Sequence, residues 1–188
     1  MVDAPKVATF VGAMGTMGIV WRPRALLGLA WAGSSDEAML AHLAERHRAT
    51  LAALDPDAAP WVEAIQRHLA GEVVDLEALP LELPGASAYR LAVYAAARQI
   101  PRGTTTTYGA LAAAAGHPGT AQAVGTAMAE NPCPIVIPCH RVVGKASAGG
   151  FSAPGGLKTK ARLLEIEGGR LGSEEAQLSF GLSDPSAG

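Results

Sequence analysis

The sequence predicts a mixed α/β (α+β) fold: a small N-terminal β-sheet with helices, packed on a mostly helical C-terminal domain that contains a helix-turn-helix. Three observations lead to this prediction. Short apolar runs broken by turn residues fill the first 31 residues, two helical patterns follow, and a glycine-bearing turn joins two short helical patterns further on. A chain of 188 residues can bury such a core without disulfides or bound metal.

The β-sheet is predicted from apolar runs that are too short for helices. Glycines and the tripeptide Arg22-Pro23-Arg24 separate these runs, and such residues favour turns between strands. The predicted strands are Val7–Val11, Gly18–Trp21 and Leu26–Trp31.

Two helices are predicted after the strands. Ser34 or Ser35 can cap the first helix, and Asp55-Pro56 interrupts it. Gly71 ends the second helix. The predicted helices are residues 36–54 and 59–70.

The domain boundary is placed at Pro84-Gly85, after an irregular stretch that contains Pro80. Beyond residue 171 the chain is acidic and contains many Ser and Gly residues, which is typical of a flexible tail. The predicted parts are an N-terminal α/β domain (1–84), a C-terminal domain (85–171) and a flexible tail (172–188).

The C-terminal domain is predicted to be mostly helical. Thr106 or Thr107 can cap its second helix, and the turn Gly116-His117-Pro118-Gly119 separates the second helix from the third. A helix, a short glycine-bearing turn and another helix form the helix-turn-helix pattern. The predicted helices are residues 88–99, about 107–115, 120–130 and about 157–167.

The third of these helices has two faces. Ala121, Val124, Ala127 and Met128 form an apolar stripe that suits a core. The other face, Gln122, Gly125, Thr126 and Ala129, is small and uncharged, so it can lie close to DNA. It has no Arg or Lys to bind guanine edges, so any sequence specificity should be weak. An ordinary helix pair packed in a core would show the same pattern.

The charges divide the chain into blocks. Residues 1–86 carry 6 Lys and Arg against 11 Asp and Glu, residues 87–171 carry 9 against 3, and residues 172–188 carry none against 3. The basic block suggests a polyanionic partner such as nucleic acid. The other interpretation is that charge simply varies along the chain.

The composition also excludes several classes of protein. No apolar run reaches the roughly 18 residues that a membrane span needs, and no clean signal peptide is present. The two cysteines cannot build a disulfide framework, no Cys-x2-Cys pair is present, and the histidines lack ligand spacing. The sequence therefore predicts a cytoplasmic protein with no metal, no other cofactor and no membrane partner.

The strongest local signal lies between Asn131 and Gly144. Three prolines stiffen an apolar segment, and the polar triplet Cys139-His140-Arg141 follows the last of them. A thiol needs a base or a positive potential to become a nucleophilic thiolate, and the neighbouring imidazole can supply the base. The alternative is a buried structural cysteine, which is how we interpret Cys133.

The segment Pro138-Cys139-His140-Arg141-Val142 resembles the signature of the O6-alkylguanine-DNA alkyltransferases, also called methylated-DNA–protein-cysteine methyltransferases. The resemblance extends from about Tyr89 to Gly168 and is loose in the N-terminal half. The matching motifs are Ile100-Pro101-x-Gly103, Tyr108-Gly109, Ala123-Val124-Gly125, Asn131-Pro132, Gly155-Gly156-Leu157, Leu163-Leu164 and Glu167-Gly168.

The resemblance implies repair of DNA by direct damage reversal. Such a protein binds duplex DNA through the minor groove, flips out an alkylated guanine and moves the alkyl group irreversibly to its own cysteine. It implies that Cys139 is the acceptor, that His140 is the base acting through a water, and that Glu167 orients His140. Asn131 would hold the hinge before the active-site segment, and Tyr108 would help to rotate the nucleotide and donate to the leaving base.

The resemblance also implies the binding partners. The expected partner is double-stranded DNA containing O6-alkylguanine, bound by a monomer that is nucleoid-associated when it acts. Backbone carbonyls of Cys139 and Val142 would accept from the guanine amino group, and Met128 would lie against the flipped ring. The substrate- and DNA-binding residues expected are Tyr108, Gln122, Gly125, Met128, Val142, Ser152 and Ala153.

Two positions depart from the family pattern. Gln122 stands where the family usually has an arginine that fills the gap left by the flipped base, which predicts weaker DNA affinity or slower repair. The loop Gly149–Pro154 is one residue longer than in some relatives. In those relatives a backbone N–H of this loop reaches the guanine oxygen. If Pro154 takes that place, Ser152 or Ala153 must supply the contact, because proline has no N–H to give.

The sequence leaves three functions to consider. The first is the single-turnover alkyltransferase. The second is a lesion-binding protein of the alkyltransferase-like kind, which lacks the acceptor cysteine, so the presence of Cys139 argues against it. The third is a thiol hydrolase unrelated to DNA, for which the sequence shows no oxyanion hole. Arg141 could raise the thiolate population or tie the two halves together, and we favour the tie.

Overall fold

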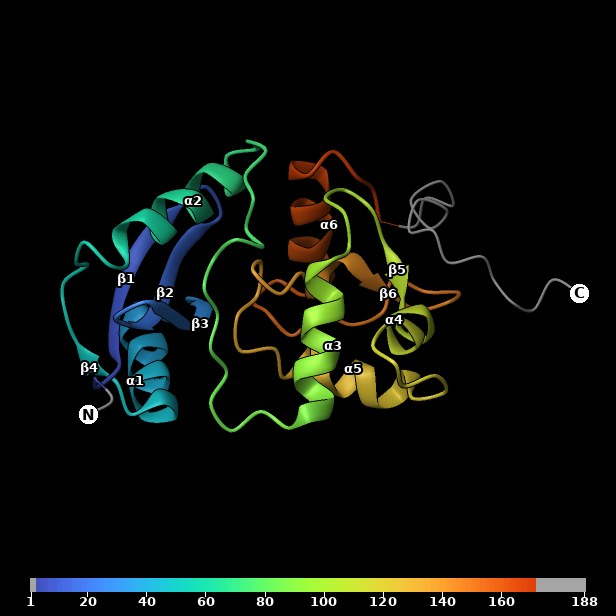
Figure 1. The fold of residues 1–188 in the computed structure, drawn as a ribbon. Helices are drawn as coiled ribbons and strands as arrows, with labels where there is room; N and C mark the ends of the chain where they lie inside the picture. The colour runs from blue at the N-terminus through green and yellow to red at the C-terminus, as the bar shows by residue number, and fades with distance from the viewer. Residues whose placement is uncertain (1–2, 172–188) are drawn as a thin grey trace, which may run out of the picture. The chain divides into compact units, whose positions relative to one another are not determined.

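The computed structural model describes residues 3–171, and the predicted tail lies outside the described residues. The chain divides into two compact units (Figure 1). The first contains the described residues up to Ser87 together with residues 131–137 and 153–155, and the second contains residues 88–130, residues 138–152 and the described residues from Gly156 onward.

A four-stranded sheet forms the centre of the first unit, which confirms the predicted small N-terminal sheet. Its order is β3-β2-β1-β4, with β1–β2 and β2–β3 antiparallel and β4 parallel to β1. Gly15 has a φ of 101° at the turn between β1 and β2, a backbone conformation that glycine adopts at little cost. The strands are β1 Lys6–Gly12, β2 Gly15–Arg22, β3 Ala25–Trp31 and β4 Thr50–Leu51.

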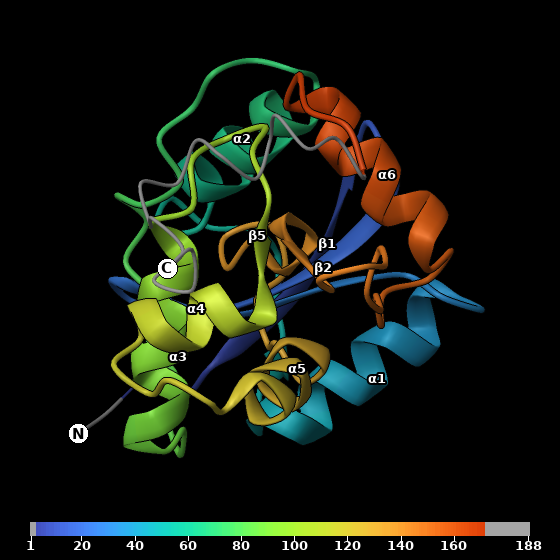
Figure 2. The ribbon, with the colours of Figure 1, turned by 90° about the vertical axis from the view of Figure 1, so that its right-hand side faces the viewer.

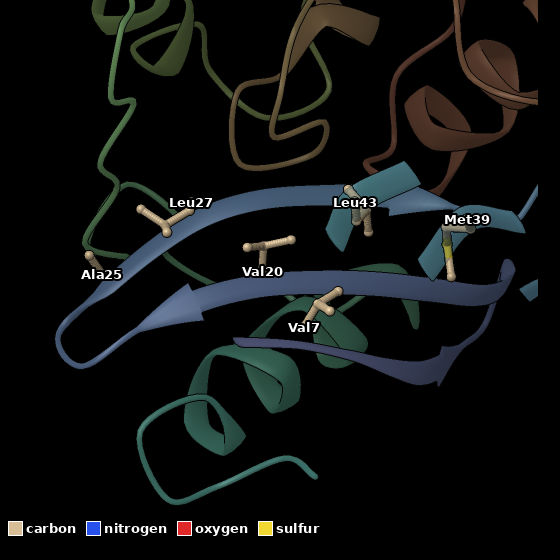
Figure 3. Close-up of a cluster of buried hydrophobic side chains, with 6 residues drawn as sticks. All are labelled: Val7, Val20, Ala25, Leu27, Met39 and Leu43. Atoms are coloured by element: carbon tan, nitrogen blue, oxygen red, sulfur yellow. The ribbon is translucent and has the colours of Figure 1, made fainter. Parts of the chain in front are cut away.

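Helix α1 (Asp36–His47) packs against β1, β2 and β3. Ser35 is the capping residue, and its hydroxyl oxygen accepts from the backbone N–H of Ala38 at 3.1 Å. Figure 3 shows the buried cluster between this helix and the sheet. The cluster consists of Val7, Val20, Ala25, Leu27, Met39 and Leu43.

The predicted helix over residues 36–54 was too long. Arg48 adopts the left-handed conformation, with a φ of 51°, and its backbone N–H closes the last turn onto Ala44 and Glu45. The chain then pairs as β4 with β1, so strand pairing replaces the helix that local propensity favours. Helix α2 (Ala59–Leu69) follows close to its predicted bounds.

The second unit is mostly helical, as predicted (Figure 2). The hydroxyl of Tyr94 on α3 donates to the carbonyl oxygen of Ala127 on α5 at 2.9 Å and so ties these two helices together. Residues 115–120 connect α4 to α5, and Thr107 caps α4. The helices are α3 Ala88–Arg98, α4 Tyr108–Ala114, α5 Ala121–Ala129 and α6 Leu157–Ile166.

A short parallel strand pair, which the sequence does not predict, positions the site. Strand β5 (Thr106–Thr107) pairs with β6 (Val142–Val143). A 3-10 helix, η1 (Cys139–Arg141), leads directly into β6, whereas β5 leads directly into Tyr108 at the start of α4. None of the helices within residues 3–171 is long and apolar enough to cross a membrane.

Candidate active site

Cys139 lies at a cavity of about 540 Å³ in the second unit. The β5–β6 pairing brings Tyr108 and the cysteine segment together, and α5 supplies another part of the lining through Gln122, Gly125 and Met128. The thiol is buried, with 7% of Cys139 exposed. The lining residues are Tyr108, Ala121, Gln122, Gly125, Met128, Ala129, Cys139, Gly150, Phe151 and Ser152.

The two residues that follow the cysteine, His140 and Arg141, form a buried hydrogen-bond network with Glu167. His140 Nε2 lies 2.8 Å from Glu167 Oε1, and both side chains are fully buried. Arg141 donates to both carboxylate oxygens of Glu167, from Nε at 2.9 Å and from Nη2 at 2.8 Å. The backbone N–H of Gly103 also donates to Glu167, at 3.1 Å. A carboxylate at the end of a helix opposes the helix dipole, and these donors offset that cost.

Arg141 does not connect the two halves of the chain, so the expected tie between them was wrong. Its guanidinium bonds to Glu167 and, at 2.6 Å, to the carbonyl oxygen of Ile100. All of these partners belong to the second unit. Arg141 instead fixes the plane of the carboxylate that faces His140.

The hydroxyl group of Tyr108 stays protonated at neutral pH. Burial raises the pKa of Tyr108 above its usual value of 10, a nearby Cys139 thiolate raises it further, and a backbone bond from Gly150 lowers it. Because the net effect is an increase, the phenol can donate a proton or a hydrogen bond into the cavity.

Besides His140 and Glu167, which form the buried network, three of the residues expected from the sequence do not line the cavity. Asn131 braces the turn 131–137 in the first unit, where its side chain donates to Ile137 O at 2.8 Å and accepts from Cys133 N at 2.9 Å. Val142 is buried in β6, and Ala153 is grouped with the first unit. Of Ser152 and Ala153, Ser152 is the one that lines the cavity.

Lys160 belongs to the site but was missed by the sequence reasoning. It is fully buried on α6, and its ammonium group donates to the carbonyl oxygens of Val142, Ala148 and Gly150, of which Gly150 lines the cavity. The signal was available: Lys160 occupies a position in the same helical stripe as Leu157, Leu163 and Leu164, where an apolar residue is expected.

Comparison with known proteins agrees with this geometry. Residues 88–169 match a family model described as "6-O-methylguanine DNA methyltransferase, DNA binding domain". Two curated relatives are both called methylated-DNA–protein-cysteine methyltransferase. The one from Thermococcus gammatolerans is 35% identical over 158 residues, which cover 81% of this chain and 88% of that protein. The one from Methanothermobacter thermautotrophicus is 42% identical over 108 residues, or 57% of this chain and 59% of that protein.

The fold has a solved counterpart in Mycobacterium tuberculosis OGT, whose crystal structure is in complex with DNA. It shares 30% identity and a TM-score of 0.70, with 86% of this chain and 92% of that chain covered. Fold and site together define a protein with a buried cysteine at a cavity, next in sequence to the histidine of a buried His–Glu pair. The chain belongs to the methylated-DNA–protein-cysteine methyltransferase family.

Proposed function

We propose that this chain repairs O6-alkylguanine in double-stranded DNA by moving the alkyl group to its own Cys139, once per molecule. The observation that carries this proposal is the cavity itself, because it places Cys139, Tyr108 and the exposed side chain of Gln122 around one space. The names of the curated relatives support the reaction, and the DNA complex of the Mycobacterium tuberculosis protein supports the partner.

DNA binding is assigned to the pair of helices α4 and α5, used as a helix-turn-helix in the minor groove. Helix α5 lines the cavity with the exposed Gln122 and with small residues such as Ala121 and Gly125. The alkylated base must leave the duplex to reach Cys139, which costs a few kcal/mol, and less where pairing is already weakened. Gln122 would fill the gap and hydrogen-bond to the orphaned partner base.

The chemical step is a displacement at the alkyl carbon. The Cys139 thiolate attacks this carbon in line with the C–O6 bond. A C–S bond forms, the C–O6 bond breaks, and its electron pair remains on the guanine. Since the thioether cannot be cleaved by the same groups, the protein is consumed in one turnover.

Two proton transfers accompany the displacement. His140 takes the thiol proton through a water molecule, and the Glu167 carboxylate at His140 Nε2 stabilises the resulting imidazolium. Tyr108 donates a proton to the leaving guanine and regains one from solvent. Its raised pKa keeps this proton available at neutral pH.

The proposal is tested with duplex DNA that contains one O6-methylguanine. We expect the intact mass to rise by one methyl group per protein, located on the peptide that contains Cys139. Cys139→Ser should bind the duplex without gaining mass. Cys133→Ser, which changes the other buried cysteine, should still be methylated. Retention of the lesion DNA without any mass gain in the wild type would overturn the transfer reaction and leave lesion binding.

The site of action follows from the partner. We infer that the protein works in the cytoplasm, at the nucleoid, as a monomer. We assign the reaction and the DNA contacts to residues 85–171, the predicted C-terminal domain. Size-exclusion chromatography coupled to light scattering, with and without a lesion duplex, tests the monomer.

A further inference from the structure

Gly28 on β3 is the meeting point of two groups that are distant from it in the sequence. A methyl group added at this glycine would lie 2.8 Å from Nε2 of His47, in the last turn of α1, and 3.4 Å from the carbonyl oxygen of Pro132. The imidazole and the carbonyl therefore share the space that a side chain at residue 28 would fill. All three residues belong to the first unit.

The imidazole of His47 has one nitrogen in this space. Nε2 is buried, and among the described residues it has no hydrogen-bond partner. A neutral imidazole can occupy such a place at a far lower cost than an imidazolium, which would be a buried charge without a partner. The space therefore suits His47 in its neutral form.

The charged groups around His47 also favour the neutral form. Burial lowers the pKa of His47 below its usual value of 6.5, and the charges of Arg46 and His42 on the same helix lower it further. No carboxylate of the described residues is among the groups that act on it. The titratable groups on the strands that pack against α1 and on the turn 131–137 are Lys6 (paired with Asp55), Arg22 (paired with Glu82) and the buried thiol of Cys133.

The carbonyl that shares this space belongs to a strained turn, residues 131–137. Ile135 is buried and has a φ of 76°, a left-handed conformation that is rare for a β-branched residue. Strain of this kind persists only where the surrounding structure holds the chain. The contacts that hold this turn include the two bonds of Asn131 and the bond from the backbone N–H of Leu29 to Pro132 O at 2.9 Å. Because the turn ends two residues before Cys139, loss of a support at Pro132 would move the thiol.

We propose that His47 is a positioning residue for the turn 131–137: its neutral imidazole fills the space above Gly28 beside the Pro132 carbonyl, and protonation of the imidazole releases the turn that leads to Cys139. The effect on alkyl transfer rests on the proposed function. The effect on the turn does not, because it concerns the protein without DNA.

The first experiment measures the turn without DNA. Hydrogen exchange of the Leu29 amide, whose N–H donates to Pro132, is followed by NMR in the full chain from about pH 8 to about pH 5 and expressed as a protection factor. The opened state takes up a proton at the usual pKa of 6.5, and the closed state only at lower pH. The protection factor should therefore be flat above about pH 6.5 and fall several-fold below it.

Two variants show whether this fall belongs to His47. His47→Gln cannot take up a proton, so its protection factor at Leu29 should not fall with decreasing pH. His42→Gln is the matched control, because it removes an exposed histidine from the same helix. It should show the same several-fold fall as the wild type.

The second experiment tests the shared space above Gly28. In Gly28→Ala the new methyl group crowds the imidazole, so we expect a lower protection factor at Leu29 near pH 8 and methyl transfer from an O6-methylguanine duplex that is several-fold slower than in the wild type. In Gly28→Ala/His47→Ala the ring is gone and the methyl group occupies part of its space. Both measurements should then return towards the wild-type values.

The results separate the possible failures. A wild-type protection factor that does not change with pH, or that falls equally in His47→Gln, would overturn the proposal. A double variant that is no better than Gly28→Ala would overturn the shared space. If circular dichroism shows Gly28→Ala to be unfolded, the exchange of His47→Gln against His42→Gln decides. A wild type that never transfers methyl fails the proposed function, while the exchange at Leu29 still decides the role of His47.

Discussion

Among single residues, Glu167 stands at the centre of the buried hydrogen-bond network. Its carboxylate accepts from His140, from two nitrogens of Arg141 and from the backbone of Gly103. The two bonds from Arg141 hold the carboxylate plane, so the oxygen that faces His140 is fixed before any substrate arrives. Preorganisation of this kind lowers the cost of forming an imidazolium during the reaction.

Glu167→Gln tests whether the carboxylate stabilises both the buried Arg141 and the His140 imidazolium. The substitution leaves the buried Arg141 guanidinium without its counter-charge, so we expect the free energy of unfolding to fall by about 3 kcal/mol. Methyl transfer should slow at least about tenfold, because His140 loses the carboxylate at Nε2. Urea unfolding and single-turnover kinetics measure the two effects. Glu165→Gln, which changes an exposed glutamate on the same helix, is the control, and equal behaviour of the two variants would contradict the assignment.

At the scale of elements, α5 and the segment after β6 shape the cavity from two sides. Helix α5 lines the cavity with neutral and mostly small side chains, whereas the segment after β6 contributes Gly150, Phe151 and Ser152, and Lys160 holds its backbone at Ala148 and Gly150. The shape of the cavity at the segment after β6 depends on the backbone φ values of that segment and on the contacts that hold it. The shape at α5 depends on the side chains of the helix. Substitutions in the two elements should therefore act differently.

Gln122→Arg tests the helix face. A guanidinium at this position adds a charge near the DNA phosphates and a longer wedge, so we expect tighter DNA binding and a transfer rate raised several-fold. Thr126→Arg places the same charge one turn along α5, exposed and outside the cavity lining. It should strengthen binding without raising the transfer rate. No change in rate for Gln122→Arg would count against the wedge.

Gly149→Ala tests the backbone wall. Gly149 has a φ of 68°, and the new methyl group would crowd the Tyr108 hydroxyl. We expect a loss of about 1 kcal/mol in the free energy of unfolding and slower transfer. Gly150→Ala is the control, because nothing lies within 4 Å of its added methyl group and its N–H to Tyr108 remains. If both variants slow the reaction equally, crowding of Tyr108 is not the cause.

At the scale of the whole molecule, buried charge is concentrated at one place. Among the described residues, the buried Lys, Arg and Glu side chains are Lys160, Arg141 and Glu167, all in the second unit. The core of the first unit is mostly apolar. Stability of the protein should therefore respond to pH through the active site more than through the sheet.

The pH dependence of stability follows from Lys160. Its folded pKa of about 8 lies below the usual 10.5, so between these values the unfolded chain binds more protons than the folded one. The contribution of Lys160 to the unfolding free energy is then flat below about pH 8 and rises with pH above it. We expect the difference between Cys139→Ser and Cys139→Ser/Lys160→Met, measured by urea unfolding, to grow from about pH 8 to about pH 10. A constant difference would contradict the shifted pKa.

The sequence predicted what depends on local pattern. The bounds of α2 to α6 lie within one or two residues of the expected ones, because caps and apolar periodicity set them. It missed the strands β4, β5 and β6, since pairs of two residues leave no periodic signal. Among the predicted residues, the structure brings together Cys139, Tyr108, Gln122, Gly125, Met128 and Ser152. Lys160 was missed because its partners are backbone carbonyls, which no side-chain motif records.

The grouping of residues 131–137 with the first unit has a consequence for modularity. The chain passes between the two units after residues 87, 130, 137, 152 and 155, so no single cut separates them. The backbone N–H of Leu29 on β3 donates to the carbonyl oxygen of Pro132 at 2.9 Å, so the sheet holds the segment that precedes Cys139. A fragment beginning at residue 85 would keep every residue around the thiol but would lose this hydrogen bond to the sheet. The N-terminal half therefore helps to hold the active-site segment. We expect that replacing it with the N-terminal half of a relative would disturb this support.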